Sequence, residues 1–109
     1  MNITKVNDSI SLSPQIAKKD VAVIKELGFK SIVNNRPDGE EPGQPLSAEI
    51  EQEAKKQGIT YRHLPVVSGS MTDGDAKQMK ALMKEIPGPV LAFCRSGSRS
   101  GKLYEKSQA

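Results

Sequence analysis

The chain has a single cysteine, a single histidine, no tryptophan and no long hydrophobic run. One cysteine excludes an internal disulfide, and a single cysteine with a single histidine is too few ligands for a zinc site. No apolar segment approaches the roughly 20 residues that cross a bilayer. The N-terminal segment MNITKVND also lacks the apolar core of a signal peptide. We therefore predict a cytoplasmic protein, and nothing in the sequence implies a metal, an organic cofactor or a membrane partner.

Aromatic residues make up only 4% of the chain, and 16 Lys and Arg against 13 Asp and Glu leave a net charge of +3. Nucleic-acid platforms combine a concentrated basic face with stacking aromatics, so nucleic acid is not expected as a partner. The small excess of positive charge favours anionic small molecules only weakly. A length of 109 residues with 36% hydrophobic content predicts one domain, residues 1–109, with one core.

Short apolar runs alternate with helical patterns along the chain, which is typical of an α/β fold. The patterns predict strands at 3–6, 9–12, 29–34, 59–67 and 90–93, and helices at 17–27, 47–57, 73–85 and from about 100 onward. Ser47 is predicted to cap the second helix, and Thr72 with Asp75 to cap the third. We expect a central, mostly parallel sheet of four to five strands flanked by helices.

A segment with the sequence CRSGSRS, residues 94–100, links the apolar strand 90–93 to the last predicted helix. Ligands of open α/β sheets bind at strand carboxyl ends, and the N–H groups of a loop that begins a helix bind anions. The guanidinium groups of Arg95 and Arg99 can hold a tetrahedral oxyanion. Nearby cations and a helix N-terminus also lower the pKa of a thiol.

We therefore predict that Cys94 is a nucleophile facing an anionic substrate, although a lone cysteine at a strand end is more often a buried filler. Gly97 is expected to let the loop backbone turn inward. Additional hydroxyl donors to the substrate are expected from Ser96, Ser98 and Ser100.

The loop resembles the active-site loop of single-domain rhodaneses, which are sulfurtransferases. The segments 20–28, 31–38 (SIVNNRPD) and 61–65 (YRHLP) are instead similar to small dual-specificity phosphatases. Both likenesses meet in one bacterial family, the beta-lactamase-hydrolase-like, protein-phosphatase-like domain, which the chain resembles over nearly its whole length. The resemblance implies a dual-specificity-phosphatase-like fold and sulfane-sulfur transfer. It also implies a persulfide dioxygenase or a sulfide:quinone oxidoreductase as a partner.

Spacing within the loop favours one of these two chemistries. Cysteine phosphatases use Cys-x-x-Gly-x-x-Arg, but this chain has Ser100 at the arginine position and Arg99 one residue earlier. The shorter loop suits a persulfide sulfur better than a phosphoryl group. A phosphatase also needs an acid for the leaving oxygen, and the exit of the preceding strand, residues 65–70, has no carboxylate. Asp73 and Asp75 follow it, but helix capping is their more common role.

The leading prediction is a sulfurtransferase in which Cys94 takes sulfur from thiosulfate or a small persulfide. The resulting persulfide is passed to a thiol acceptor or cyanide, and Arg95 and Arg99 bind the anionic donor. One alternative is a cysteine-dependent phosphatase with a phosphocysteine intermediate and an acid from Asp73 or Asp75. The other is a non-catalytic module that binds an oxyanion or docks onto a partner oxidoreductase.

Three further residues are candidates for the rim of the pocket. Arg36 and Asp38, on the loop after the third strand, match positions of the resembled family and either pair with each other or face the pocket. His63, near a strand end, either faces the pocket or is structural. The last helix, with Gly101 in it, is shorter than the resemblance implies, which is typical of a chain that is truncated or continues into another domain.

Overall fold

The structure, a computed structural model, describes residues 1–109 and contains a strand or helix in every region where the sequence predicts one. In chain order the elements are β1 (Thr4–Lys5), β2 (Ile10–Ser13), α1 (Asp20–Glu26), β3 (Ser31–Asn34), α2 (Ser47–Gln57), β4 (Thr60–His63), α3 (Asp73–Glu85), β5 (Val90–Phe93) and α4 (Ser98–Ser107). The helix α1 starts later than the predicted residue 17 because the Asp20 carboxylate accepts the N–H of Ala17 at 2.8 Å, which makes a turn there.

The five strands form one sheet in the order β1-β2-β5-β3-β4. Only β1 pairs antiparallel; β2, β5, β3 and β4 are parallel to one another. The expected mostly parallel sheet is therefore confirmed. Because four strands share one direction, their carboxyl ends and the loops that follow them meet at one edge of the sheet, with β5 between β2 and β3.

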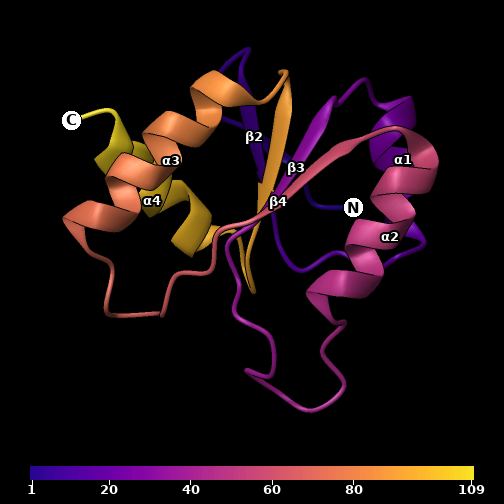
Figure 1. The fold of residues 1–109 in the computed structure, drawn as a ribbon, viewed down its shortest axis with the longest axis horizontal. Coiled ribbons are helices and arrows are strands. Elements are labelled where there is room, and N and C mark those ends of the chain that lie inside the picture. The colour runs from indigo at the N-terminus through magenta and orange to yellow at the C-terminus, as the bar shows by residue number, and fades with distance from the viewer.

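Helices cover both faces of this sheet (Figure 1). The helices α1 and α2 pack on one face against Ile32, Leu91 and Phe93. On the opposite face, α3 and α4 pack against Val33 and Ala92. Alternate residues of β3 and β5 thus enter two different clusters, which explains why the centre of β3 and the whole of β5 are apolar instead of alternating with polar residues.

Of the two predicted helix caps, one is present and the other is not. The predicted capping box of α3 is present: Thr72 Oγ1 accepts the N–H of Asp75 at 3.1 Å, and the Asp75 carboxylate accepts the N–H of Thr72 at 2.9 Å. The predicted Ser47 cap of α2 is wrong. The hydroxyl of Ser47 lies 2.7 Å from the Tyr61 hydroxyl, and the Ser47 N–H donates to the Asp38 carboxylate at 2.8 Å. A residue from the preceding loop therefore caps this helix.

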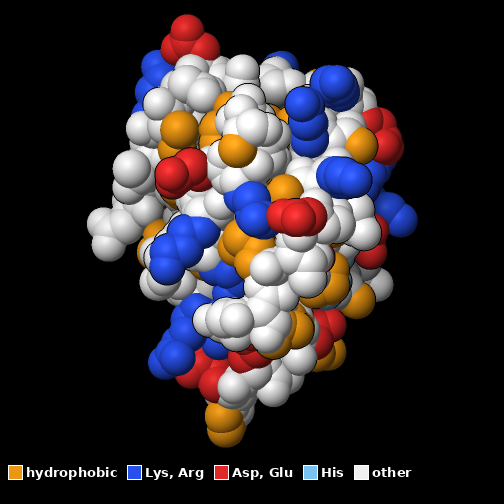
Figure 2. All heavy atoms as spheres, turned by 90° about the vertical axis from the view of Figure 1, so that its left-hand side faces the viewer, with side chains coloured by type: hydrophobic (Ala, Val, Ile, Leu, Met, Phe, Trp, Pro, Cys, Tyr) orange, Lys and Arg blue, Asp and Glu red, His pale blue; other side chains and the backbone are white.

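The last helix, α4, begins at Ser98, slightly before the predicted start. It forms although its sequence is intrinsically weak, because Leu103 is fully buried against the α3 side of the core. The face built by α3 and α4 carries lysine and arginine side chains interspersed with acidic and hydrophobic ones (Figure 2). No helix of the structure has both the length and the apolar character that crossing a membrane requires.

Candidate active site

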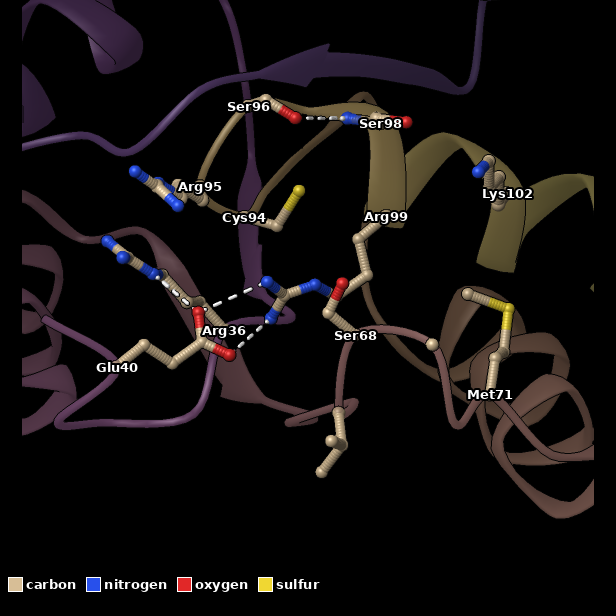
Figure 3. A pocket seen from close by; sticks show the side chains of 12 residues that line it. Arg36, Glu40, Ser68, Met71, Cys94, Arg95, Ser96, Ser98, Arg99 and Lys102 are labelled. Atoms are coloured by element: carbon tan, nitrogen blue, oxygen red, sulfur yellow. Dashed lines mark hydrogen bonds and ion pairs between the residues drawn. The ribbon is translucent and has the colours of Figure 1, made fainter.

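A pocket of about 720 Å³ lies where the loops after β3, β4 and β5 meet the start of α4 (Figure 3). Four of its lining residues are cationic and one, Glu40, is acidic, so the pocket is suited to an anion. The loop after β4 adds an apolar side through Val67 and Met71. The complete lining is Arg36, Glu40, Val67, Ser68, Gly69, Met71, Cys94, Arg95, Ser96, Ser98, Arg99 and Lys102.

The only cysteine continues the central strand into this pocket. Cys94 follows β5 directly, is only 1% exposed as a whole residue, and lines the pocket. Its Sγ accepts a hydrogen bond from the N–H of Gly97 at 3.1 Å. Gly97 has a φ of 93°, and a Cβ there would lie 3.4 Å from the backbone of Ser13, so the loop requires glycine at this position. The sequence-based expectation that Gly97 lets the loop turn inward therefore has a structural reason.

Arg99 reaches the same pocket from the first turn of α4, and its guanidinium is held by two neighbouring loops. The two oxygens of Glu40 accept from Nη1 and Nη2 at 3.0 and 3.1 Å. The carbonyl oxygen of Val66 accepts a second proton of Nη1 at 3.1 Å. Position 99 is therefore tied to the loops after β3 and β4, and the orientation of the arginine does not depend on its own helix alone.

Behind Glu40 lies Arg36, whose side chain is 1% exposed. Its Nε donates to Glu40 at 2.8 Å, its Nη2 to Glu41 at 2.9 Å and its Nη1 to Gln15 at 3.1 Å. Burial lowers the pKa of Arg36, but the hydrogen bonds and charges of Glu40 and Glu41 outweigh this effect and raise it. The hydrogen bond from Arg99, supported by Arg36, lowers the pKa of Glu40 despite its burial. Both groups are therefore charged at neutral pH.

Several residues predicted for the site line the pocket, namely Cys94, Arg95, Ser96, Ser98, Arg99 and Arg36. Ser100 does not line it, since it is buried and its hydroxyl donates to the side chain of Asn35 at 2.8 Å. Asp38 caps α2, and His63 Nε2 lies 2.8 Å from the carbonyl oxygen of Arg36. The expected pairing of Arg36 with Asp38 is also absent, because the partners of Arg36 are Glu40 and Glu41.

The structure gives no support to an acid from the start of α3. Asp73 pairs with Lys106 at 2.9 Å, and Asp75 completes the capping box. Neither lines the pocket. The one carboxylate that does is Glu40, which sequence analysis missed. Its spacing of four from Arg36, inside a loop too rich in Pro and Gly to form a helix, was the available signal.

No group of three or more His, Cys, Asp and Glu side chains is placed to hold a metal ion. The groups that the site does offer are the Cys94 thiol, the Gly97 N–H that donates to it and several guanidinium groups. Such a set can bind a tetrahedral oxyanion and attack it with sulfur.

The fold and the position of the cysteine define a protein of the cysteine-phosphatase fold class. The catalytic core of the PP-IP phosphatase Siw14 from S. cerevisiae has the same architecture, with a TM-score of 0.73, 21% identity and coverage of 94% of this chain and 62% of that one. More specifically, the chain belongs to the family described as beta-lactamase hydrolase-like protein, phosphatase-like domain, whose model matches residues 2–109. The family predicted by the resemblance is thus confirmed.

Relatives with higher identity support the same assignment. A crystal structure of a candidate phosphatase from Neisseria meningitidis is 38% identical, with a TM-score of 0.89 over 95% of this chain and 74% of that one. Beta-lactamase hydrolase-like proteins from Agrobacterium fabrum and Xylella fastidiosa are 36% and 33% identical over 100% and 99% of this chain. The chain spans only about a quarter (25%) of the length of these two proteins.

Proposed function

We propose that this chain is a cysteine-dependent phosphatase domain in which Cys94 is the nucleophile. The observation that carries the proposal is the environment of the sulfur: Sγ lies in the cationic pocket and accepts the Gly97 N–H at 3.1 Å. This N–H holds the sulfur in place, and the cationic lining attracts the anionic ester that the sulfur would attack. The likeness to the Neisseria candidate phosphatase supports the choice of phosphorus as the atom attacked.

In this reaction Sγ attacks phosphorus and the S–P bond forms as the P–O ester bond breaks. The leaving oxygen departs with the bonding electron pair. Water then attacks phosphorus, the S–P bond breaks, and inorganic phosphate and the Cys94 thiolate are regenerated. The role proposed for Arg95 and Arg99 is to hold the phosphoryl oxygens during both steps.

The pocket favours substrates whose leaving group needs no proton. Its only carboxyl group, Glu40, is paired with two arginines that lower its pKa, so it holds no proton to give at neutral pH. General acid catalysis contributes about 10²–10⁴-fold to a rate, and that contribution matters most for poor leaving groups. We therefore expect aryl phosphates to be hydrolysed far faster than alkyl phosphates.

The test compares p-nitrophenyl phosphate with phosphoserine for the wild-type chain and the Cys94→Ser variant. The wild type is expected to hydrolyse the aryl ester and to prefer it by about 10²-fold or more. Cys94→Ser should lose this activity while retaining its fold by circular dichroism. Equal hydrolysis by wild type and Cys94→Ser would refute the proposal.

Sulfur transfer is the second candidate, and two observations favour it, one from the spacing of the motif and one from the pocket. Arg99 follows the cysteine by five positions, and the pocket has no protonated acid. With thiosulfate, Sγ would attack the outer sulfur, the S–S bond would break, and sulfite would leave with the electron pair. Sulfite needs no proton to leave, and the Cys94 persulfide would then give its outer sulfur to cyanide or a thiol.

Mass spectrometry distinguishes the two chemistries on one residue. A persulfide adds about 32 Da to Cys94 after thiosulfate treatment, whereas a trapped phosphoryl group adds about 80 Da. Thiocyanate formation from thiosulfate and cyanide, lost in Cys94→Ser, would favour sulfur transfer over phosphate hydrolysis. If neither adduct forms and neither product is released, a binding module is the better description.

A further inference from the structure

The hydrogen bonds of Arg99 leave one edge of its guanidinium without partners. Of its five N–H donors, both on Nη1 and one on Nη2 are used by Glu40 and Val66. The two that remain are the N–H of Nε and the second proton of Nη2. In a planar guanidinium these two protons point in the same direction from one edge, so they can bind two oxygens of one oxyanion together.

Nε of Arg99 is the one buried side-chain nitrogen or oxygen atom in the chain without a hydrogen-bond partner. Native structures leave few such donors unpaired, because an unpaired buried donor is costly. Arg99 and Cys94 line the same pocket, so an oxyanion attacked by Cys94 is the partner that this edge fits. Nε is covered in this structure, and the side chains around it must open slightly for that pairing.

The orientation of Arg99 is set by a connected series of contacts that begins in the interior. Arg36, with its side chain 1% exposed, is fixed by Gln15 and Glu41 and donates to Glu40 at 2.8 Å. Glu40 in turn receives both terminal nitrogens of Arg99. In Figure 3 the carboxylate of Glu40 lies between the two arginines. Glu40 is thereby held in place from one side while it holds Arg99 on the other.

We propose that Glu40 is a positioning residue for oxyanion binding: by occupying the end of the Arg99 guanidinium, it leaves the Nε–Nη2 edge free for the substrate. This inference rests on the proposed function, which requires a tetrahedral oxyanion in the pocket. It also accounts for the arginine at position 99, one residue before Ser100. Ser100 faces Asn35 in the interior, whereas Arg99 leaves the helix toward Glu40.

Charge alone predicts the opposite result from positioning, which makes the inference testable. Glu40 is the only acidic residue among the lining residues, beside Arg36, Arg95, Arg99 and Lys102. Replacing Glu40 by glutamine adds one unit of positive charge to the pocket, and by Coulomb attraction alone an anion should bind more tightly. If Glu40 positions Arg99, the same replacement should weaken anion binding.

The experiment measures the affinity of tungstate, a tetrahedral dianion, by calorimetry at pH 7 for the wild type, Glu40→Gln and Glu41→Gln. Glu41 is the matched control, since it also pairs with Arg36 at 2.9 Å but makes no contact with Arg99. Its other oxygen lies 3.9 Å from Arg95 in an exposed, long ion pair, so removing that charge leaves Arg95 free to bind the anion. We expect Glu40→Gln to bind about tenfold or more weakly, the loss of one charge-assisted hydrogen bond. Glu41→Gln should stay within about twofold of the wild type or bind slightly more tightly.

Binding by Glu40→Gln that equals or exceeds that of the wild type would overturn the proposal. Glu40→Asp provides a second variant that keeps the charge but shortens the reach. It is also expected to weaken tungstate binding, and wild-type affinity in Glu40→Asp would count against positioning. This variant keeps the question decidable if Glu40→Gln does not fold.

A double-mutant cycle with Arg99→Lys separates positioning from a general structural effect. Lysine has no edge of two N–H groups, so adding Glu40→Gln to Arg99→Lys should cause no further loss of tungstate affinity. An equal loss in both backgrounds would show that Glu40 acts on the loop in general and would refute the proposal. Because these assays need no catalysis, an intact cycle without Cys94-dependent hydrolysis would refute only the proposed function.

Discussion

Replacing Gly97 with alanine perturbs the one loop position whose backbone conformation and surroundings both require glycine. Its φ is 93°, and a Cβ at this position would lie 3.4 Å from the carbonyl carbon and oxygen of Ser13. The left-handed conformation costs an alanine roughly 1–2 kcal/mol, and the tight contact adds to that. We expect Gly97→Ala to lower the free energy of unfolding by about 2 kcal/mol, which corresponds to a Tm decrease of roughly 8–16 °C.

Gly58→Ala is the matched control, because Gly58 also has a positive φ, 75°, but no atom within 4 Å of its Cβ position. Its free energy of unfolding should fall only by the cost of the left-handed conformation, about 1 kcal/mol. Urea unfolding in parallel with Gly97→Ala measures this difference. The loop variant should differ in activity as well. A shift of the residue-97 N–H away from Cys94 Sγ is expected to slow p-nitrophenyl phosphate hydrolysis about tenfold or more.

Gly58→Ala should retain full activity, since Gly58 ends α2 and does not line the pocket. Two results would contradict the reasoning. The first is a Gly97→Ala protein as stable as Gly58→Ala, which would mean that the Ser13 contact costs nothing. The second is unchanged hydrolysis by Gly97→Ala, which would mean that the N–H on Sγ has no part in the reaction.

Two further predictions concern stability. Arginine partners lower the pKa of Glu40 and of Glu41 in the folded state. Their ion pairs therefore stabilise the protein fully above the unfolded Glu pKa of about 4.3. This stabilisation is lost as the pH falls through the lower pKa of the folded state. The free energy of unfolding, measured with urea, should therefore fall more steeply below about pH 4.3 for the wild type than for a Glu40→Gln/Glu41→Gln variant. Parallel pH profiles of the two proteins would argue against the ion pairs. Tyr61→Phe should cost about 1–3 kcal/mol, because the Tyr61 hydroxyl contacts Ser47 at 2.7 Å and Asn34 at 3.0 Å and both partners would lose it; an unchanged unfolding midpoint would contradict this prediction.

The sequence by itself predicts the elements of this protein because each is encoded by neighbouring residues. The capping box of Thr72 and Asp75 and the strand, loop and helix around Cys94 depend on spacings of a few positions. The mostly parallel sheet follows from the alternation of apolar runs with helical patterns. The family resemblance likewise depends on short motifs. The local pattern failed at Ser47, because Asp38, nine positions earlier in the chain, caps α2 instead.

The partners of the site residues were decided only by the tertiary structure. Arg99 and Glu40 are 59 positions apart, and no local pattern relates them. They meet because parallel strands bring their following loops to one edge of the sheet, and there the long side chains of several loops can pair. The same geometry turns Ser100 inward to Asn35, 65 positions away, although it belongs to the motif. Local spacing therefore identifies the nucleophile, whereas the surroundings that determine its chemistry depend on how distant loops pack together.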